Sequence, residues 1–266
     1  MTPELKYVNN DIEACIFGKS LERYITEKDS EKQIIQQKEF LSEYFKIPKE
    51  RIFFLEQVHG FDCIQITEYD ILLNKKTFYH KADGLITNLR NVILCIRTAD
   101  CLPLFMHTDP HKENKIIGIL HSGWRGIYRG IITHGIQIIQ HHLEKIKFHY
   151  KVEKKDPDYE QKVGYPITIF PGVYIPGNLY EVDYDVAQLF PVVQAKKDIY
   201  NHSNGKYLLD LWKNIEFILQ SMKDKAKFHI EDPFHYLNGD QNEIFSRFYS
   251  HRRGDKFRNL NIIYIK

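Results

Sequence analysis

The chain has 266 residues, of which 43% are hydrophobic and 27% charged, so it is long enough to bury a substantial core. Its 37 basic and 35 acidic side chains give a formal net charge of +2, which does not favour nucleic acid or an anionic membrane as a partner. No apolar run is long enough to span a membrane and the first residues do not resemble a signal peptide, so we expect a cytoplasmic protein.

The first half of the chain predicts one helix followed by short strands. Residues 30–45 have apolar side chains near helical spacing, and Pro48 follows this segment. Later apolar runs are short and rich in β-branched residues, which is typical of strands. These strands are predicted at residues 51–58, 63–67, 84–87, 92–97, 104–107 and 116–120.

The second half changes period at residues 126–146, which predict a helix. Residues 147–164 are highly charged and contain Pro and Gly, so we interpret them as a surface loop or insertion. Beyond this segment the pattern predicts a strand at 165–171, helices at 183–190 and 207–223, and a strand at 260–265. Mixed strands and helices without a clear linker favour a single α/β or α+β domain over residues 1–266.

Three potential metal ligands lie at or just beyond predicted strands: His59, Cys101 and His121. They are 42 and 20 residues apart, so only the folded sheet could bring them together. Imidazole and thiolate both suit zinc, and three protein ligands are typical of a catalytic ion, whose fourth position takes water or substrate. Such an ion provides a hydroxide nucleophile near neutral pH.

The spacing of these ligands leaves simpler interpretations open. A single histidine beside a glycine is usually polar surface, and a single cysteine in an apolar run is usually part of the core. The other three cysteines, Cys15, Cys63 and Cys95, are interpreted as core residues. Four cysteines are too few for a disulfide framework in a chain of this length.

Four motifs in a fixed order carry a family resemblance. They are residues 57–60 (QVHG), 82–87 (ADGLIT), 98–104 (TADCLPL) and 121–126 (HSGWRG). The sequence resembles the bacterial laccase-domain proteins, once labelled multicopper polyphenol oxidases. Members of that family are described as purine nucleoside phosphorylases with adenosine deaminase and methylthioadenosine phosphorylase activity, and they include a peptidoglycan editing factor. Residues 180–182 (YEV) and 245–253 (FSRFYSHRR) are similar to later motifs of the family, so the resemblance covers nearly the whole chain.

The resemblance implies that His59, Cys101 and His121 bind one zinc ion. It also implies a four-layer α/β/β/α sandwich like the catalytic domain of cytotoxic necrotizing factors. The implied substrates are phosphate and the purine nucleosides adenosine, inosine, guanosine and methylthioadenosine. Copper can bind a His₂Cys set adventitiously. Ordinary multicopper oxidases use several His-x-His pairs and this sequence contains none, so polyphenol oxidation is disfavoured.

Two residues near the ligands are candidates for catalytic roles. Arg125 is expected where a strand gives way to a helix, and a guanidinium there suits an anion such as phosphate. Its alternative is an ion pair with a structural carboxylate. Asp100, beside Cys101, is a candidate for orienting a metal histidine, and its alternative is a cap at a strand end.

Four further residues are candidates for substrate contacts. Asp83 is also typical of a turn, and Trp124 of packing. Glu181 is a candidate in the cleft, with a surface carboxylate as the alternative. Arg252 belongs to a basic, aromatic cluster at 249–253 that can hold a phosphate or stack a base.

The sequence leaves three functional hypotheses open. The favoured one is a zinc-dependent purine nucleoside phosphorylase with adenosine deaminase activity, acting on small molecules and not on nucleic acid or membranes. The second is a cytoplasmic hydrolase that edits peptidoglycan precursors with the same metal. The third is a zinc-retaining binding protein without turnover, motivated by departures from the family pattern at Gln37, Lys38 and Phe257. The oligomeric state is not predicted.

Overall fold

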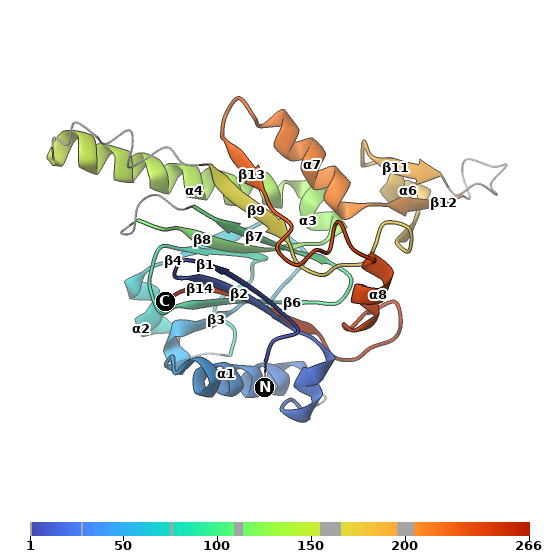
Figure 1. The fold of residues 1–266 in the computed structure, drawn as a ribbon, viewed down its shortest axis with the longest axis horizontal. Coiled ribbons are helices and arrows are strands. Elements are labelled where there is room, and N and C mark those ends of the chain that lie inside the picture. The colour runs from blue at the N-terminus through green and yellow to red at the C-terminus, as the bar shows by residue number, and fades with distance from the viewer. Residues whose placement is uncertain (1, 28, 75–76, 109–113, 155–165, 196–204) are drawn as a thin grey trace.

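The computed structural model describes residues 2–27, 29–74, 77–108, 114–154, 166–195 and 205–266. Two large mixed sheets lie face to face in a mixed α/β fold. Helix α1 (Ser30–Phe45) covers the outer side of one sheet, and α4 (Ile131–Phe148) with α7 (Leu211–Ser221) covers the outer side of the other (Figure 1). The likeness to cytotoxic necrotizing factors stays a prediction, as does the single domain. No helix in the described part of the chain is both long and apolar enough to cross a membrane.

The first sheet has five strands and contains the end of the chain at its centre. In spatial order they are β1 (Leu5–Asn9), β2 (Ile12–Phe17), β14 (Asn259–Ile265), β6 (Ile93–Thr98) and β3 (Ile52–Phe54). Strand β14 is antiparallel to both β2 and β6, whereas β3 is parallel to β6. Alternate residues of β14 face opposite sides, so Leu260 and Ile262 pack under α1 while Ile263 packs between the sheets.

Helix α1 has the bounds that its sequence predicts. The Asp29 carboxylate accepts the backbone N–H groups of Glu31 and Lys32 and so caps the helix start. The helix ends at Lys46, which has a left-handed φ of +57°. Short elements link this region to the sheet, namely the 3₁₀ turns η1 (Lys19–Arg23) and η2 (Lys49–Arg51) and the helix α2 (Glu68–Leu73).

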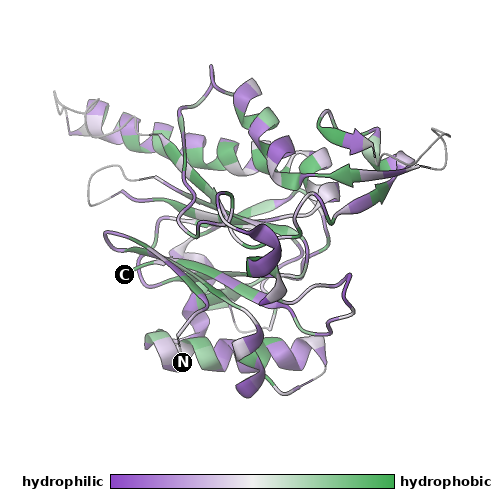
Figure 2. Ribbon diagram, turned by 45° about the vertical axis from the view of Figure 1, so that its right-hand side comes forward, coloured by the Kyte–Doolittle hydropathy of each residue, from purple (hydrophilic) through white to green (hydrophobic). Residues whose placement is uncertain are grey.

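The second sheet has six strands, and β8, one of the two central strands, carries His121. The spatial order is β13 (Phe228–Ile230), β9 (Ile167–Pro171), β7 (Leu102–His107), β8 (Ile117–Ser122), β5 (Gly84–Thr87) and β4 (Cys63–Ile66). Figure 2 shows hydrophobic residues along the strands of both large sheets, and alternating hydrophobic and hydrophilic residues along α4. Such alternation in a helix gives one apolar stripe, which packs on the sheet.

The structure corrects the predicted helix at 126–146 and the loop after it. Helix α3 (Trp124–Arg129) and α4 are separate, because Gly130 has a φ of +98° and ends α3. Helix α4 continues to Phe148, and a π-helical turn η3 (His149–Glu153) follows it, so the first part of the predicted loop is helical. Residues 155–165 lie outside the described part of the chain.

A third, small sheet corrects the predicted helix at 207–223. It consists of β10 (Glu181–Asp183), β12 (Lys206–Leu209) and β11 (Val193–Ala195), so the start of the predicted helix is a strand. Asp210 separates β12 from α7, because its carboxylate accepts the backbone N–H of Lys213 and caps α7. The helix predicted at 183–190 is shorter, as α6 (Tyr184–Ala187), and α8 (Gln241–Ser246) was not predicted.

Candidate metal centre

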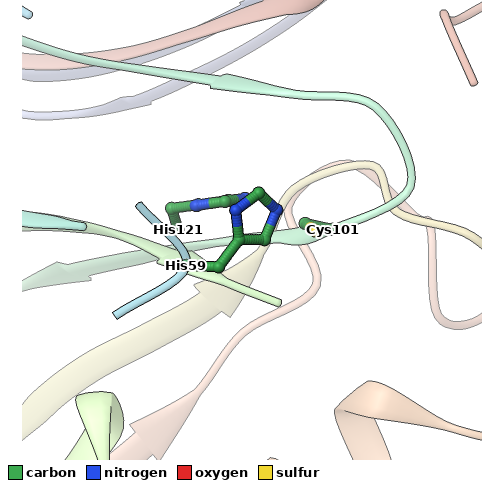
Figure 3. A group of neighbouring side chains, drawn as sticks. All are labelled: His59, Cys101 and His121. Atoms are coloured by element: carbon green, nitrogen blue, oxygen red, sulfur yellow. The ribbon is translucent and has the colours of Figure 1, made fainter. Parts of the chain in front are cut away.

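His59, Cys101 and His121 come from distant parts of the chain and meet at one point (Figure 3). Their ligand atoms all lie within 4.8 Å of one another. The rings of His59 and His121 are T-shaped, with centroids 4.7 Å apart. One metal ion can bind this set, whose members the sequence predicted; that the ion is zinc stays a prediction.

Strand pairing explains how Cys101 and His121 meet. In the antiparallel pair of β7 and β8, Pro103 lies opposite His121. Cys101 is two residues before Pro103, so its side chain is on the same face of the sheet as His121. His59 reaches the pair from the loop after β3, where it has a left-handed φ of +56°.

Asp83 holds two of the three ligands in place. Its side chain is fully buried, and Oδ1 lies 2.7 Å from Nδ1 of His121. The same carboxylate accepts the backbone N–H groups of Val58, His59 and Gly60 at 3.1, 3.0 and 2.7 Å. A carboxylate in this position orients the imidazole and leaves Nε2 for the metal.

This arrangement corrects two expectations: that Asp83 contacts substrate and that Asp100 orients a metal histidine. Asp83 directly precedes β5, which pairs with β8, and its carbonyl oxygen accepts the backbone N–H of His121 at 2.7 Å. The sheet therefore places Asp83 behind His121. The Asp100 carboxylate instead accepts the backbone N–H of Arg252 at 2.9 Å.

Gln57 is a second positioning residue, to which sequence reasoning gave no role. Its side-chain amide donates to the carbonyl oxygen of Arg97 at 2.8 Å and accepts the Arg97 N–H at 2.7 Å. These two bonds fasten the loop of His59 to strand β6. His59 and Asp100 both have positive φ, which costs on the order of 1–3 kcal/mol at each non-glycine residue and persists only where the surroundings enforce it. The position of Gln57 in the QVHG motif was the sequence signal that could have indicated its positioning role.

The ligands change one another's ionisation. Burial raises the pKa of the Cys101 thiol, but His121 and His59 lower it by a larger amount, so that the resulting pKa is about 6. Burial lowers the pKa of the His121 imidazole, whereas Cys101 and Asp83 raise it to about 9. Without a metal, a thiolate and an imidazolium therefore form a pair at neutral pH. The thiolate is also the form that binds a metal.

We expect Cys101 to be the first thiol of the metal-free protein to react with iodoacetamide. Burial raises the pKa of Cys15 to about 12 and also raises those of Cys63 and Cys95, whereas that of Cys101 is about 6. Because the thiolate is the nucleophile, the rate at Cys101 should be level above about pH 7. Peptide mass spectrometry across pH 5 to 9 measures this, and zinc should protect the residue. Earlier modification of another cysteine, or a rate still rising tenfold per pH unit above pH 7, would contradict the expectation.

The cluster lines a cleft with a volume of about 640 Å³. The described residues that line it include four arginines but only two carboxylates, Glu56 and Asp100. The arginines are Arg97, Arg125, Arg252 and Arg258. An excess of positive charge in a recess attracts anionic ligands.

Arg125 and Trp124 line the cleft at the start of α3, directly after the strand of His121. The Arg125 guanidinium lies over the Trp124 ring, 4.4 Å from its centroid. Arg125 is exposed and Trp124 half-buried. The strand-to-helix position expected for Arg125 is confirmed, and its role stays a prediction.

The C-terminal cluster meets the cleft through His251 and Arg252, of which Arg252 has the more extensive contacts. The Arg252 backbone N–H donates to Asp100, its guanidinium donates to the carbonyl oxygen of Glu181, and it lies 4.8 Å from the ring centroid of Tyr180. Glu181 is not among the described residues that line the cleft. The structure thus brings Asp100, Arg252 and Glu181 together, but Glu181 contributes its backbone to holding Arg252.

Comparison with known proteins places this site in a family. The family model described as multi-copper polyphenol oxidoreductase laccase matches residues 17–266. The chain is 34% identical over 119 residues to a purine nucleoside phosphorylase of Rickettsia prowazekii, a match that covers 44% of this chain and 45% of that protein. It is 28% identical over 232 residues to purine nucleoside phosphorylase YlmD of Bacillus subtilis, with 85% of this chain and 74% of that protein covered.

Solved structures show the same fold. YlmD from Geobacillus stearothermophilus aligns with a TM-score of 0.63 at 22% identity, covering 97% of this chain and 93% of that one. A Neisseria meningitidis protein aligns with a TM-score of 0.65 at 17% identity, covering 98% of both chains. Because the family match extends over nearly the whole sequence, the chain belongs to the multi-copper polyphenol oxidoreductase laccase family.

Proposed function

We propose that this chain is a zinc-dependent purine nucleoside phosphorylase that cleaves adenosine, inosine, guanosine or methylthioadenosine with phosphate. The observation that carries the proposal is a His–Cys–His cluster in a cleft of about 640 Å³ lined by four arginines. A metal ligand set beside positive charge suits a reaction between an anion and a neutral nucleoside. The names of the relatives, purine nucleoside phosphorylase, support the substrate class.

The residues present fit zinc. Two imidazoles and a thiol of low pKa are ligands that zinc prefers, and Asp83 fixes one imidazole with Nε2 towards the cluster. Gly123 leaves room for the sulfur, because a Cβ there would lie 2.9 Å from Cys101 Sγ. His59, Cys101 and His121 would hold the ion, and zinc, when bound, supplies a Lewis acid in the cleft.

The side chains of the cleft suit the steps of phosphorolysis. An oxygen of phosphate forms a bond to C1′ of the ribose, while the bond from C1′ to the purine nitrogen breaks and its electron pair leaves with the base. Guanidinium groups hold the phosphate in place. The exposed part of Trp124, whose ring has the Arg125 guanidinium over one face, is available for contact with the purine beside the ligands.

Asp100 is the carboxyl group that we assign to proton transfer to the departing purine. Glu56, the other carboxylate among the described residues of the cleft, lies 3.5 Å from the Lys81 ammonium. Asp100 is only 8% exposed, and its Oδ1 has no hydrogen-bond partner among the described residues. A buried carboxyl oxygen without a partner at the wall of a cleft is available to a ligand.

Asp100→Asn is expected to lower kcat by about 10²–10⁴-fold, the usual contribution of general acid–base catalysis. Asparagine has the same shape and tolerates the φ of +85° at this position. Zinc content should stay at one ion per chain, since Asp100 does not contact His121. Steady-state kinetics and metal analysis of the same sample measure both quantities. A kcat within threefold of the wild type would remove Asp100 from proton transfer.

The experiment that tests the function incubates zinc-loaded protein with adenosine, with and without phosphate, and separates the products by chromatography. Adenine and ribose 1-phosphate formed only with phosphate support the proposal. Inosine formed in either sample would add the deaminase activity that the family resemblance implies. If adenosine survives in both samples, and inosine, guanosine and methylthioadenosine do as well, the phosphorylase proposal is wrong.

The same zinc-loaded protein separates the two other hypotheses. Release of an amino acid from a peptidoglycan precursor would favour the editing hydrolase. One bound zinc with no turnover of nucleosides or precursors would favour a binding protein. Oxidation of a phenol by copper-loaded protein would not establish the oxidoreductase in the family's name, because a His₂Cys set can bind copper adventitiously.

A further inference from the structure

Arg97 and Arg258 are brought together by the pairing of β6 with β14. In this antiparallel pair, Leu260 lies opposite Arg97, and Arg258 is two residues before Leu260. Residues two apart in an extended chain share a face, so both arginines are on the same face of the sheet. Leu260 packs under α1, which identifies this face as the one that α1 covers.

Both guanidinium groups lie where this layer opens into the cleft of the metal ligands. Nη2 of Arg97 donates to Oγ of Ser30, the first residue of α1, at 2.8 Å. Nη1 of Arg258 donates to the carbonyl oxygens of residues 255–257 at 2.9 to 3.5 Å. All these acceptors are neutral, and within the described residues neither arginine has an ion pair with a carboxylate. Both side chains line the cleft.

Two neighbouring cations without a carboxylate are costly to hold in a recess. Burial, together with the charge of Arg258, lowers the pKa of Arg97 to about 10, so Arg97 remains charged at neutral pH. An anion between them offsets both the repulsion and the desolvation. The planar guanidinium matches phosphate with paired N–H donors.

Each of the other two arginines of the cleft lies over an aromatic ring. Arg125 stacks on Trp124, and Arg252 donates to Glu181 and lies over Tyr180. The start of α1 is also occupied, because Asp29 accepts its first N–H groups. Nε and Nη2 of Arg258 have no hydrogen bond within the described residues, so these donors remain for a ligand beside Arg97.

We infer that Arg97 and Arg258 form the phosphate site of the cleft, in place of Arg125, for which the sequence alone suggested that role. Two guanidinium groups on the same face of the sheet suit a doubly charged oxyanion such as phosphate. That the anion is inorganic phosphate, the second substrate, rests on the proposed function. Arg125, which is stacked on the Trp124 ring, would then contact the nucleoside and not the phosphate.

Equilibrium dialysis of radiolabelled inorganic phosphate against the zinc-loaded full chain, without nucleoside, tests this inference. Arg258→Gln is the primary variant, because the hydrogen bonds of the Arg258 side chain go only to the neighbouring residues 255–257. We expect its phosphate affinity to fall by about tenfold or more, the effect of one charge-assisted contact. Arg97→Gln should give a similar loss, with circular dichroism as the folding check because Arg97 also holds Ser30. Arg129→Gln removes an exposed charge of α3 outside the lining and should change the affinity by less than twofold.

Three outcomes would overturn the inference. They are absence of phosphate binding to the wild type at millimolar concentration, a larger loss in Arg125→Gln than in Arg258→Gln, and displacement of labelled phosphate by adenosine 5′-monophosphate at lower concentration than by phosphate itself. The last result would assign the site to a phosphate ester.

The measurement separates this inference from the proposed function. Phosphate bound through Arg258 without any cleavage of nucleoside would support the phosphate site and contradict the proposed phosphorylase activity. Cleavage of nucleoside with the same KM for phosphate in Arg258→Gln and wild type would sustain the phosphorylase and refute the site.

Discussion

Cys101→Ala is expected to release the metal and to lower kcat/KM for phosphorolysis by more than about 10³-fold, the several kcal/mol that a catalytic metal supplies. Cys101 is the anionic member of the cluster, since its neighbours hold the thiol pKa at about 6. The two remaining imidazoles are a neutral, incomplete ligand set. Elemental analysis of dialysed protein gives the zinc content, and steady-state kinetics on the same sample give the activity.

Cys63→Ala is the matched control for this experiment. Cys63 is buried in β4, its pKa is raised by burial, and it is not a member of the cluster. Its replacement should cost about 1 kcal/mol of stability and leave zinc content and activity in place. Full turnover by zinc-free Cys101→Ala would show that the chemistry does not depend on the metal. Loss of zinc in both variants would show that the loss reflects folding.

Asp83→Asn is expected to weaken zinc binding by about 10–100-fold and to destabilise the metal-free protein by about 3 kcal/mol. The two carboxylate oxygens accept three backbone N–H groups and the imidazole of His121. An asparagine offers one oxygen, so its NH₂ group would face a donor in a fully buried position. Competition with a chromophoric chelator measures the affinity, and urea denaturation measures the free energy of unfolding.

The neighbouring Asp62 provides the control, because its side chain is exposed while only its backbone carbonyl oxygen accepts the N–H groups of Asp83 and Gly84. Asp62→Asn should leave both quantities unchanged. Burial raises the pKa of the Asp83 carboxyl, but His121 and the backbone N–H groups lower it by a larger amount. The resulting pKa lies below the usual range. Its stabilising effect is therefore present above about pH 4 and lost as pH falls through the lowered pKa. Wild-type zinc affinity in Asp83→Asn would assign the orientation of His121 to the backbone alone.

The local sequence pattern correctly predicted the bounds of those helices and strands whose capping and apolar-spacing signals lie within the element itself. Helix α1 has its predicted bounds because apolar spacing and the Asp29 cap agree, and β5 coincides with its short apolar run. Where long-range strand pairing overrides a local pattern, the prediction was wrong. Residues 207–223 have an apolar pattern that suits a helix throughout, yet pairing of β12 with β10 and β11 makes its first part a strand.

For the site, the sequence by itself predicted the His–Cys–His cluster that could hold a metal ion and the family to which the chain belongs, because each of the four motifs is a continuous stretch of sequence that can be read without coordinates. Only the tertiary structure decided what those ligands touch. Sequence reasoning left Asp100 open between orienting a metal histidine and capping a strand end, and Asp83 between a turn and a substrate contact. It missed their actual partners, because the bond of Asp83 to His121 and that of Asp100 to Arg252 span 38 and 152 residues. The pairing of Arg97 with Arg258 likewise depends on the register of β6 and β14. Hydrogen-bond partners and neighbouring charges follow from such long-range strand pairing, which no local pattern of residue types encodes.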